Sequence, residues 1–387
     1  MKRKPWTPSS RSDIEPFIVM EVMRAAADRE HAGAHIIHME VGQPGAPTPA
    51  TVIAAAHTAL ADGRIGYTEA LGMRKLRQRI AGYYGEMHGV GVPMERIVVT
   101  TGSSAGFNLA YLAAFDRGDR IAVTAPGYPA YRNLATALGL EIVEIPIGPD
   151  TRFMLTPAML EEVHARTPLA GVLVASPANP TGTLMEPEAL QALIGAAHGM
   201  GIRFISDEIY HRLVYHGEAA TALQFNDDVI VVNSFSKYYC MTGWRIGWMV
   251  VPEPLVRAVE RISQNQYISA PDISQRAALA AFDATQELDV IKAGYAANRL
   301  LLLDRLPKIG FEDIFPVDGA FYVYASVRSF ANDSVEFTRR MLAEAGVAAT
   351  PGADFDRARG HGFLRFSFAG TEADMAEGMQ RLTAWLK

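Results

Sequence analysis

Five short apolar runs, separated by stretches of helical character, constrain the fold of this chain more than any other feature. The runs are rich in β-branched residues and occupy residues 96–100, 120–123, 171–175, 203–206 and 229–232. Strands that are apolar along their whole length are typical of a parallel sheet covered by helices on both faces. The alternation therefore predicts a doubly wound α/β domain.

The character of the sequence changes after about residue 285. Longer charged helices are indicated at residues 291–306 and 335–345, and short strands at residues 320–324 and 362–367. Elements that do not alternate strictly indicate a smaller α+β domain. The N-terminal segment, with an amphipathic stretch at residues 16–29, could pack on it. We therefore expect a large domain over residues 45–285 and a small domain formed by residues 1–44 and 286–387.

Composition excludes several classes of protein. The 36 Lys and Arg residues against 42 Asp and Glu give a net charge of −6, which leaves no basic footprint for nucleic acid. A single cysteine, Cys240, cannot form an intrachain disulfide, and no Cys/His spacing of a zinc site occurs. The basic start is not followed by an apolar signal core, and no apolar run approaches the roughly 18 residues of a membrane span. We expect a cytoplasmic protein with no metal, membrane or nucleic-acid partner.

Polar and glycine-rich segments follow the predicted strands. In open α/β sheets, ligands bind beyond the carboxyl ends of the strands, so these segments form the candidate site. They occupy residues 101–106, 125–131, 176–182, 207–210 and 234–247.

Each of these segments, taken alone, also has a purely structural interpretation. Residues 103–105 open a helix whose N–H groups could bind phosphate or could simply pack. Tyr128 could stack on a ligand or cap the core. Asp207 could bind a ligand or be the N-cap of a following helix. Lys237 could be a solvated surface charge.

Together, the segments supply a phosphate cradle, an aromatic ring, a carboxylate, a phenol, an amide and an amine. These groups can hold a pyridine aldehyde cofactor: a lysine amine forms a Schiff base with the aldehyde, and an aspartate keeps the ring nitrogen protonated. The combination predicts pyridoxal-phosphate chemistry at Lys237 and Asp207.

The chain resembles the class I/II aminotransferases, the aspartate-aminotransferase-like group of pyridoxal-phosphate enzymes of fold type I. The resemblance implies a large domain with a mostly parallel seven-stranded sheet, a smaller α+β domain, and ping-pong transfer of an amino group from an L-amino acid to a 2-oxo acid. Nine motifs, spread from about residue 37 to 370, carry it in order: residues 41–44, 66–68, 72–77, 101–104, 126–128, 179–182, 207–210, 234–237 and 365–367.

The resemblance implies a role for each matched residue. Lys237, Asp207 and Tyr210 would be catalytic: Lys237 would form the Schiff base and move the substrate proton, Asp207 would pair with the ring nitrogen, and Tyr210 would hydrogen-bond the phenolic oxygen with Asn179. Tyr128 would stack on the ring. The phosphate would be bound by Ser103, Ser104, Ala105, Ser234 and Arg245.

The same resemblance implies the substrate and subunit contacts. Arg365 would bind the substrate α-carboxylate, with Gly42 and Asn179 beside it. Tyr67 would reach the phosphate of a neighbouring subunit, so we expect a homodimer with shared active sites.

Three questions stay open at this point. The same fold and cofactor could serve a carbon–sulfur β-elimination lyase or an enzyme similar to aminocyclopropane-carboxylate synthase. A non-catalytic aminotransferase-like regulator is a more remote alternative, because the residues before the family match are too few for a DNA-binding module. No spare Lys or Arg in the motifs is available for a second carboxylate, which favours neutral or aromatic donors.

Overall fold

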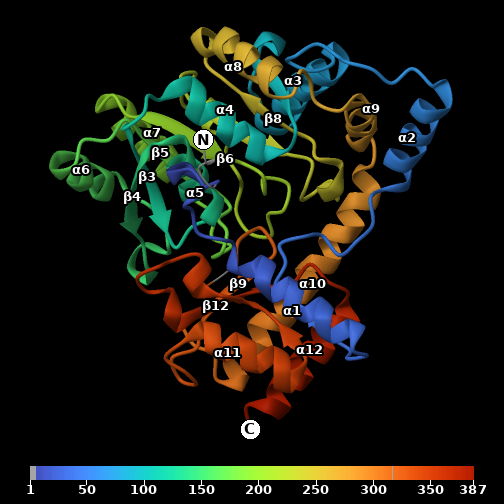
Figure 1. The fold of residues 1–387 in the computed structure, drawn as a ribbon, viewed down its shortest axis with the longest axis vertical. Helices are drawn as coiled ribbons and strands as arrows, with labels where there is room; N and C mark the ends of the chain where they lie inside the picture. Colours follow the sequence, from blue (N-terminus) through green and yellow to red (C-terminus); the bar gives the residue numbers. More distant parts are fainter. Residues whose placement is uncertain (1–5, 316) are drawn as a thin grey trace, which may run out of the picture.

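The computed structural model describes residues 6–315 and 317–387, so the basic start of the chain lies outside the described part. Its largest element is a seven-stranded sheet with the order β2-β8-β7-β6-β5-β3-β4, in the upper half of Figure 1. Strand β8 runs in the opposite direction to the other six strands, which are all parallel to one another. The predicted mostly parallel seven-stranded sheet is confirmed. The strands are β2 (Ile97–Thr100), β3 (Arg120–Ala125), β4 (Glu141–Pro146), β5 (Gly171–Ala175), β6 (Arg203–Asp207), β7 (Ile230–Ser234) and β8 (Gly247–Val250).

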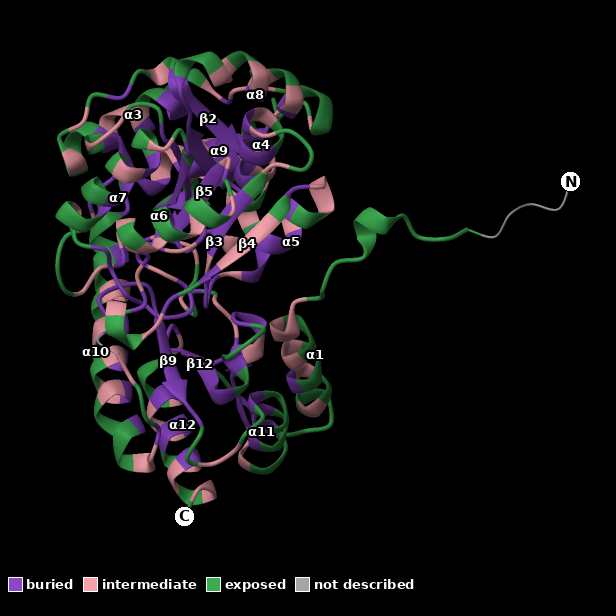
Figure 2. Cartoon of the chain, turned by 90° about the vertical axis from the view of Figure 1, so that its left-hand side faces the viewer, coloured by how far each residue is buried: buried purple, intermediate pink, exposed green. Residues whose placement is uncertain are grey.

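Side chains alternate between the two faces of the sheet, and each face packs against its own helices. On β2, Val98 joins an apolar cluster with Phe107 of α4 (Ser103–Ala114), whereas Val99 joins a second cluster with Leu193 of α7 (Pro187–Gly199). Burial on both faces explains why the strands show no polar alternation. Figure 2 shows the buried strands between helical layers. The other helices of this half are α2 (Ala50–Asp62), α3 (Arg74–His88), α5 (Pro129–Leu138), α6 (Pro157–Arg166), α8 (Glu253–Gln266) and α9 (Asp272–Ala281).

A smaller α+β unit occupies the lower half of Figure 1. It contains a three-stranded antiparallel sheet, β11 (Thr350–Pro351), β12 (Phe363–Ser367) and β9 (Tyr322–Ser326), and a parallel pair, β1 (Ile37–His38) with β10 (Val347–Ala348). The pairing of β1 with β10 joins the two ends of the chain. The helices of this unit are α1 (Ile18–His31), α10 (Thr285–Ile309), α11 (Ser334–Arg340), the π-helix η6 (Met341–Ala345) and α12 (Glu372–Trp385).

Short 3₁₀ turns complete the described part of the chain. They are η1 (Ser10–Ser12), η2 (Met94–Arg96), η3 (Pro149–Thr151), η4 (Ala222–Gln224), η5 (Thr242–Trp244), η7 (Gly352–Asp354) and η8 (Gly360–Gly362). Within residues 6–315 and 317–387, no helix is both long and apolar enough to cross a bilayer. The domain boundary near residue 285 stays a prediction; in the structure, α10 begins at that residue and descends from the upper half into the lower half (Figure 1).

Three local predictions differ from the structure. The helix expected at residues 291–306 is the middle of the longer α10. The helix expected at residues 335–345 is divided into α11 and η6. The alternative that Asp207 caps a helix is wrong, because no helix follows it directly and residues 209–212 form a turn. The Asp207 carboxylate accepts a hydrogen bond from the Ile209 N–H at 3.1 Å, at the start of that turn.

Candidate active site

A single cavity at the carboxyl edge of the large sheet brings most of the predicted site residues together. It encloses about 890 Å³ of space, counting its open mouth. The predicted residues that line it are Gly42, Ser103, Ser104, Tyr128, Asn179, Asp207, Tyr210, Lys237, Arg245 and Arg365.

The topology of the sheet explains this assembly. Segments that follow β2, β3, β5, β6 and β7 all leave the same edge, because these strands are parallel to one another. Arg245 instead precedes β8, and it reaches the same edge because β8 is the antiparallel strand. One strand reversal therefore adds a guanidinium to a site that is otherwise built from strand ends.

The first turn of α4 and Arg245 form an anion-binding corner. Among the described residues no side chain caps α4, whose N-cap is Gly102, so its first N–H groups remain available to a ligand. Gly102 has a φ of +84°, and a Cβ at this position would lie 2.4 Å from Arg245 Nη2. Only glycine therefore allows the guanidinium to approach the helix start this closely.

Two predicted phosphate contacts are absent from the cavity lining. Ala105 lies one residue further into α4 than Ser104. The Ser234 hydroxyl is buried and is already hydrogen-bonded within the protein, to Ser236 Oγ at 2.8 Å and to Ile246 O at 3.2 Å. Ser236, quoted in the motif but not assigned a role, lines the cavity instead.

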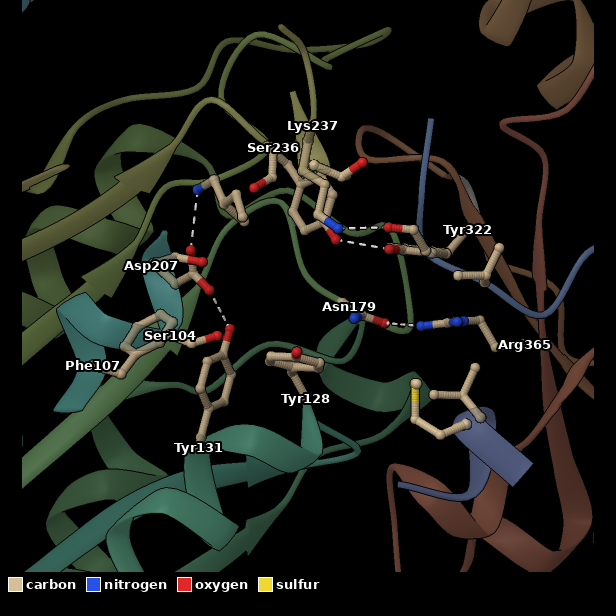
Figure 3. Close-up of a pocket in the computed structure, with 18 of the residues that line it drawn as sticks. Ser104, Phe107, Tyr128, Tyr131, Asn179, Asp207, Ser236, Lys237, Tyr322 and Arg365 are labelled. Carbon is tan, nitrogen blue, oxygen red and sulfur yellow. Dashed lines mark hydrogen bonds between the residues drawn. The ribbon is translucent and has the colours of Figure 1, made fainter. Parts of the chain in front are cut away.

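Asp207 is a buried carboxylate at the end of β6. The Tyr131 hydroxyl donates to it, as Figure 3 shows, and the sequence analysis did not assign Tyr131 a role. Burial raises the pKa of Asp207 to about 6, while the hydrogen bonds from Tyr131 and Ile209 and the charge of Lys237 oppose the shift. Asp207 is therefore an acceptor held ready for a cationic or N–H ligand.

Lys237 projects into the cavity from the segment after β7. Its Nζ donates to the carbonyl of Gly42 at 2.5 Å. Burial, followed by the positive charge of Arg365, lowers the pKa of Lys237 to about 8, although Asp207 opposes this. An amine with such a pKa is partly unprotonated near neutral pH and can act as a nucleophile or a proton acceptor.

Tyr210 is paired with a second tyrosine that the sequence analysis missed. The hydroxyls of Tyr210 and Tyr322 lie 2.8 Å apart, and both side chains line the cavity. A Cβ on Gly42 would lie 2.2 Å from the Tyr322 hydroxyl. The absence of a side chain at residue 42 is therefore required for this tyrosine pair to face Lys237.

Arg365 lies at the centre of β12 and is 3% exposed. Its Nη1 donates to Asn179 Oδ1 at 2.9 Å (Figure 3), and its guanidinium lies 4.3 Å from the Tyr322 ring centre and 4.8 Å from that of Phe355. Its Nε has no hydrogen-bond partner among the described residues. A buried guanidinium with an unused donor suits a carboxylate ligand.

Tyr128 lines the cavity beside an apolar wall from α1 that the sequence analysis also missed. The Phe17 ring stacks on Tyr128 at 5.9 Å and 17°. Met23 lies four residues after Val19 and three residues after Met20, so the three side chains present one face of α1 to the cavity. The amphipathic stretch at residues 16–29 was the available signal, but it did not show where the apolar face would pack.

Tyr67, a third predicted phosphate contact, is also absent from this cavity and lies in a different pocket. Its side chain is 81% exposed, in a loop that lines a second pocket with the start of α3 and parts of α9.

Within residues 6–315 and 317–387, no group of three or more His, Cys, Asp or Glu side chains could hold a metal ion.

Glu208 is a fully buried acid that no predicted role uses. Its carboxylate accepts hydrogen bonds from Ser206 Oγ at 3.2 Å and Thr221 Oγ1 at 2.9 Å. Burial raises the pKa of Glu208 to about 8, against the effect of these donors. His211 Nδ1, which has no hydrogen-bond partner in the described part of the chain, lies 3.4 Å from the carboxylate, and burial lowers the pKa of His211. At neutral pH we therefore expect a protonated carboxyl beside a neutral imidazole.

This acid should make the protein less stable as the pH rises. The folded-state pKa lies above the unfolded value of 4.5, so the stabilisation is fully present below pH 4.5 and is lost as the pH rises through about 8. Glu208→Gln, which cannot ionise, should reduce the fall in Tm between pH 5 and pH 8 by about 2 °C or more in thermal melts. The exposed control Glu312→Gln should behave as the parent. An unchanged pH dependence in Glu208→Gln would contradict a buried neutral acid.

The donor set fits a phosphorylated pyridine aldehyde. The uncapped α4 start, Arg245 and Ser236 could hold the phosphate; Asp207 could accept from the ring nitrogen; and Lys237 is an amine in the same cavity. Tyr128 offers a ring face, while Tyr210 and Asn179 offer hydrogen-bond groups for a phenolic oxygen.

Comparison with known proteins places this architecture among characterised relatives. The family model described as aminotransferase class I and II matches residues 34–382. The chain is 51% identical over 380 residues to a valine–pyruvate aminotransferase of Mycobacterium tuberculosis, with 97% of each chain covered. It is 33% identical over 379 residues to a (5-formylfuran-3-yl)methyl phosphate transaminase of Methanocaldococcus jannaschii, covering 97% of this chain and 98% of that protein. A crystal structure of an aminotransferase from Mycobacterium tuberculosis superposes with a TM-score of 0.96 at 50% identity, covering 99% of each chain.

Proposed function

Since this chain belongs to the class I and II aminotransferase family and is an aminotransferase that acts on amino and 2-oxo acids, we propose that it binds pyridoxal phosphate at Lys237 and prefers a neutral aliphatic donor such as valine, with pyruvate as acceptor. The observation that carries the donor preference is the lining of the cavity. Its basic residues in the described part of the chain are Lys237, Arg245 and Arg365, and each already has a proposed task.

The cofactor, when bound, supplies an aldehyde for amines and a ring that accepts the electron pair released at the substrate α-carbon. Asp207 would hold the proton on the ring nitrogen, and burial beside Tyr131 keeps this carboxylate out of contact with water. The N–H groups at the start of α4 and the Arg245 guanidinium would neutralise the phosphate. The protein thereby fixes both ends of the ring.

Lys237 would carry the proton in the reaction. The lowered pKa of its amine would let it accept a proton from the substrate α-carbon and donate that proton again later in the amino transfer. The Gly42 carbonyl, 2.5 Å from Nζ, orients the amine. Because Gly42 belongs to the segment that follows β1, this contact joins the proton carrier to the chain's N-terminal part.

Arg365 would bind the α-carboxylate of either substrate. An incoming carboxylate can pair with the guanidinium in a bidentate geometry. Asn179 Oδ1 accepts a hydrogen bond from Arg365 Nη1 at 2.9 Å and so helps to orient the guanidinium. This leaves the substrate side chain facing the apolar surface of α1.

Side-chain preference would follow from that surface. Val19, Met20, Met23 and Val41 supply apolar contacts, and burying a charged side chain against them without a partner is unfavourable. The name of the valine–pyruvate aminotransferase of Mycobacterium tuberculosis, at 51% identity, supports the same donor and acceptor.

A donor panel tests this proposal. With the cofactor and pyruvate present, valine should yield alanine and 3-methyl-2-oxobutanoate, with a kcat/KM about 10²-fold above that for aspartate. Chromatography of amino and oxo acids provides the measurement. A preference for aspartate would overturn the donor class. With a sulfur amino acid such as cysteine and no oxo-acid acceptor, turnover should stop after one amino group per site, whereas continued release of pyruvate, ammonia and sulfide would favour the lyase alternative.

We also propose a homodimer with shared active sites. Support comes from the loop that holds Tyr67, where Tyr67 is 81% and Ile65 is 44% exposed. Apolar and aromatic side chains left in the open are typical of a surface that a second copy covers. Sedimentation velocity at micromolar concentration should give twice the 42.1 kDa of one chain. A single species of 42.1 kDa that remains active would contradict the shared site.

A further inference from the structure

Helix α1 obtains its N-terminal cap from a distant part of the chain. Its own N-cap residue is Phe17, and no side chain within the helix start caps it in the described structure. Instead, Oδ1 of Asp354 accepts a hydrogen bond from the Ile18 N–H at 3.0 Å, across 336 residues of sequence. A carboxylate at this position both accepts from a free N–H group and interacts favourably with the helix dipole.

The turn that carries Asp354 also contacts both parts of the proposed catalytic site. Asp354 is 2% exposed and ends η7. The next residue, Phe355, packs its ring 4.8 Å from the Arg365 guanidinium, and its carbonyl accepts from the Gly127 N–H at 3.0 Å, beside the ring-stacking Tyr128. The cap is therefore one residue away from a ring that packs directly against Arg365.

A second anchor lies just before the helix. The Glu15 carboxylate accepts from Arg357 Nε at 2.9 Å, and the Glu15 carbonyl accepts from Asn133 Nδ2 of α5 at 3.0 Å. The segment from Glu15 to Ile18 is thus tied to the smaller unit and to the large sheet's helices at once. Such ties on both sides fix where α1 begins.

The two faces of α1 have different tasks. Val22 and Ala26, four residues apart, pack against Ile36, Leu342 and Ala348 of the smaller unit. On the neighbouring face, residues 19, 20 and 23 line the cavity, and Met20 is still 57% exposed. A helix held by few buried contacts needs its cap to keep this apolar face over the cavity.

We propose that Asp354 is a positioning residue that sets side-chain selectivity: by capping α1, it holds the apolar face of the helix against the donor side chain. The inference rests on the proposed function. A large aliphatic donor would use these contacts, whereas alanine, with a single methyl group, would use few of them. Loss of the cap should therefore change the ratio between donors rather than the rate with all donors.

The first measurement compares donors on the holoenzyme. Asp354→Ala should lower kcat/KM for valine by about five- to thirty-fold, the upper part of the range expected for one lost N-cap, and mainly through KM. For alanine the change should stay below about threefold. Asp354→Asn keeps an acceptor oxygen and should recover most of the selectivity. If valine proves to be a poor donor, the best large donor found in the panel takes its place in the ratio.

The matched control is Asp333→Ala. Asp333 accepts from the Val335 N–H at 2.9 Å and so caps α11, a helix that contributes no residue to the cavity lining. This control should lose stability and leave the ratio between donors unchanged. An equal change of the ratio in both variants would overturn the proposal.

The second measurement does not depend on activity. Hydrogen exchange of the amides at residues 18–23 should be faster in Asp354→Ala than in the parent and in Asp333→Ala, by about the same five- to thirty-fold factor. Unchanged exchange would overturn the cap. Faster exchange with an unchanged donor ratio would also overturn the proposal, because the cap would then be structural alone. The two proposals can fail separately. If valine is not the preferred donor, but Asp354→Ala still exchanges faster and still changes the ratio between large and small donors, the valine assignment is wrong and the role of Asp354 stands.

Discussion

Replacing Lys237 with Ala should abolish sustained transamination, with a fall in kcat/KM of about 10⁴-fold or more. The cavity would lose both its amine nucleophile and its proton carrier, and general acid–base catalysis alone contributes up to about 10⁴-fold. Lys237→Arg should not restore activity, although it keeps a positive charge, because a guanidinium does not release its proton. Initial rates with valine and pyruvate provide the measurement.

A separate readout assigns the covalent site. After borohydride reduction of the holoenzyme, peptide mapping by mass spectrometry should find the cofactor on the peptide that contains Lys237. Lys308→Ala is the matched control, since Lys308 is exposed and pairs with Asp304 on α10, far from the cavity lining. Sustained turnover by Lys237→Ala, or reduction that labels another lysine, would show that the proposed site is wrong.

Asp207→Asn should lower kcat by about 10³-fold, while the protein stays folded. Asparagine has nearly the same shape, but it has no charge with which to hold a proton on the ring, and removal of one preorganised electrostatic group costs roughly 10²–10³-fold. The matched control is Asp318→Asn, which removes another buried carboxylate, paired with Arg152 at 2.9 Å. We expect that control to reduce stability and to leave kcat close to that of the parent.

Tyr131→Phe tests the same carboxylate through its pKa. The Tyr131 hydroxyl lowers the pKa of Asp207 against the effect of burial, so its removal should raise that pKa above about 6. The acidic limb of the kcat/KM profile should then move to higher pH, and the rate above the limb should fall by less than in Asp207→Asn. A profile that does not move would show that Asp207 does not control the acidic limb.

The strand-end residues could be predicted from the sequence because their positions follow from a regular topology. Parallel strands bring their carboxyl ends to one edge, so Tyr128, Asn179, Asp207 and Lys237 were expected to meet, and the cavity contains all four. The ordered motifs also indicated the family, which the match over residues 34–382 shows. The roles of these residues stay predictions until the variants are measured.

Residues that depend on tertiary packing could not be predicted in the same way. Tyr131 lies one helical turn after Tyr128, but no local pattern shows that its hydroxyl faces Asp207, 76 residues away. Tyr322 reads as one aromatic residue of a core strand until Gly42 is seen to leave room for its hydroxyl. The cap of α1 by Asp354 joins segments near opposite ends of the chain, where neither periodicity nor spacing carries information.

The union of both chain ends in one cavity has a consequence for the order of events during synthesis. Arg365 donates to the carbonyl of Glu40, 325 residues earlier. Strand β1 can pair only after β10 has been synthesised. At about 5–20 residues per second, translation separates these partners by roughly 15 to 65 s. The strands of the large sheet, all complete by Val250, can assemble in that interval. We expect the substrate side of the cavity to form last, so that α1 spends this time on the ribosome with its apolar face uncovered.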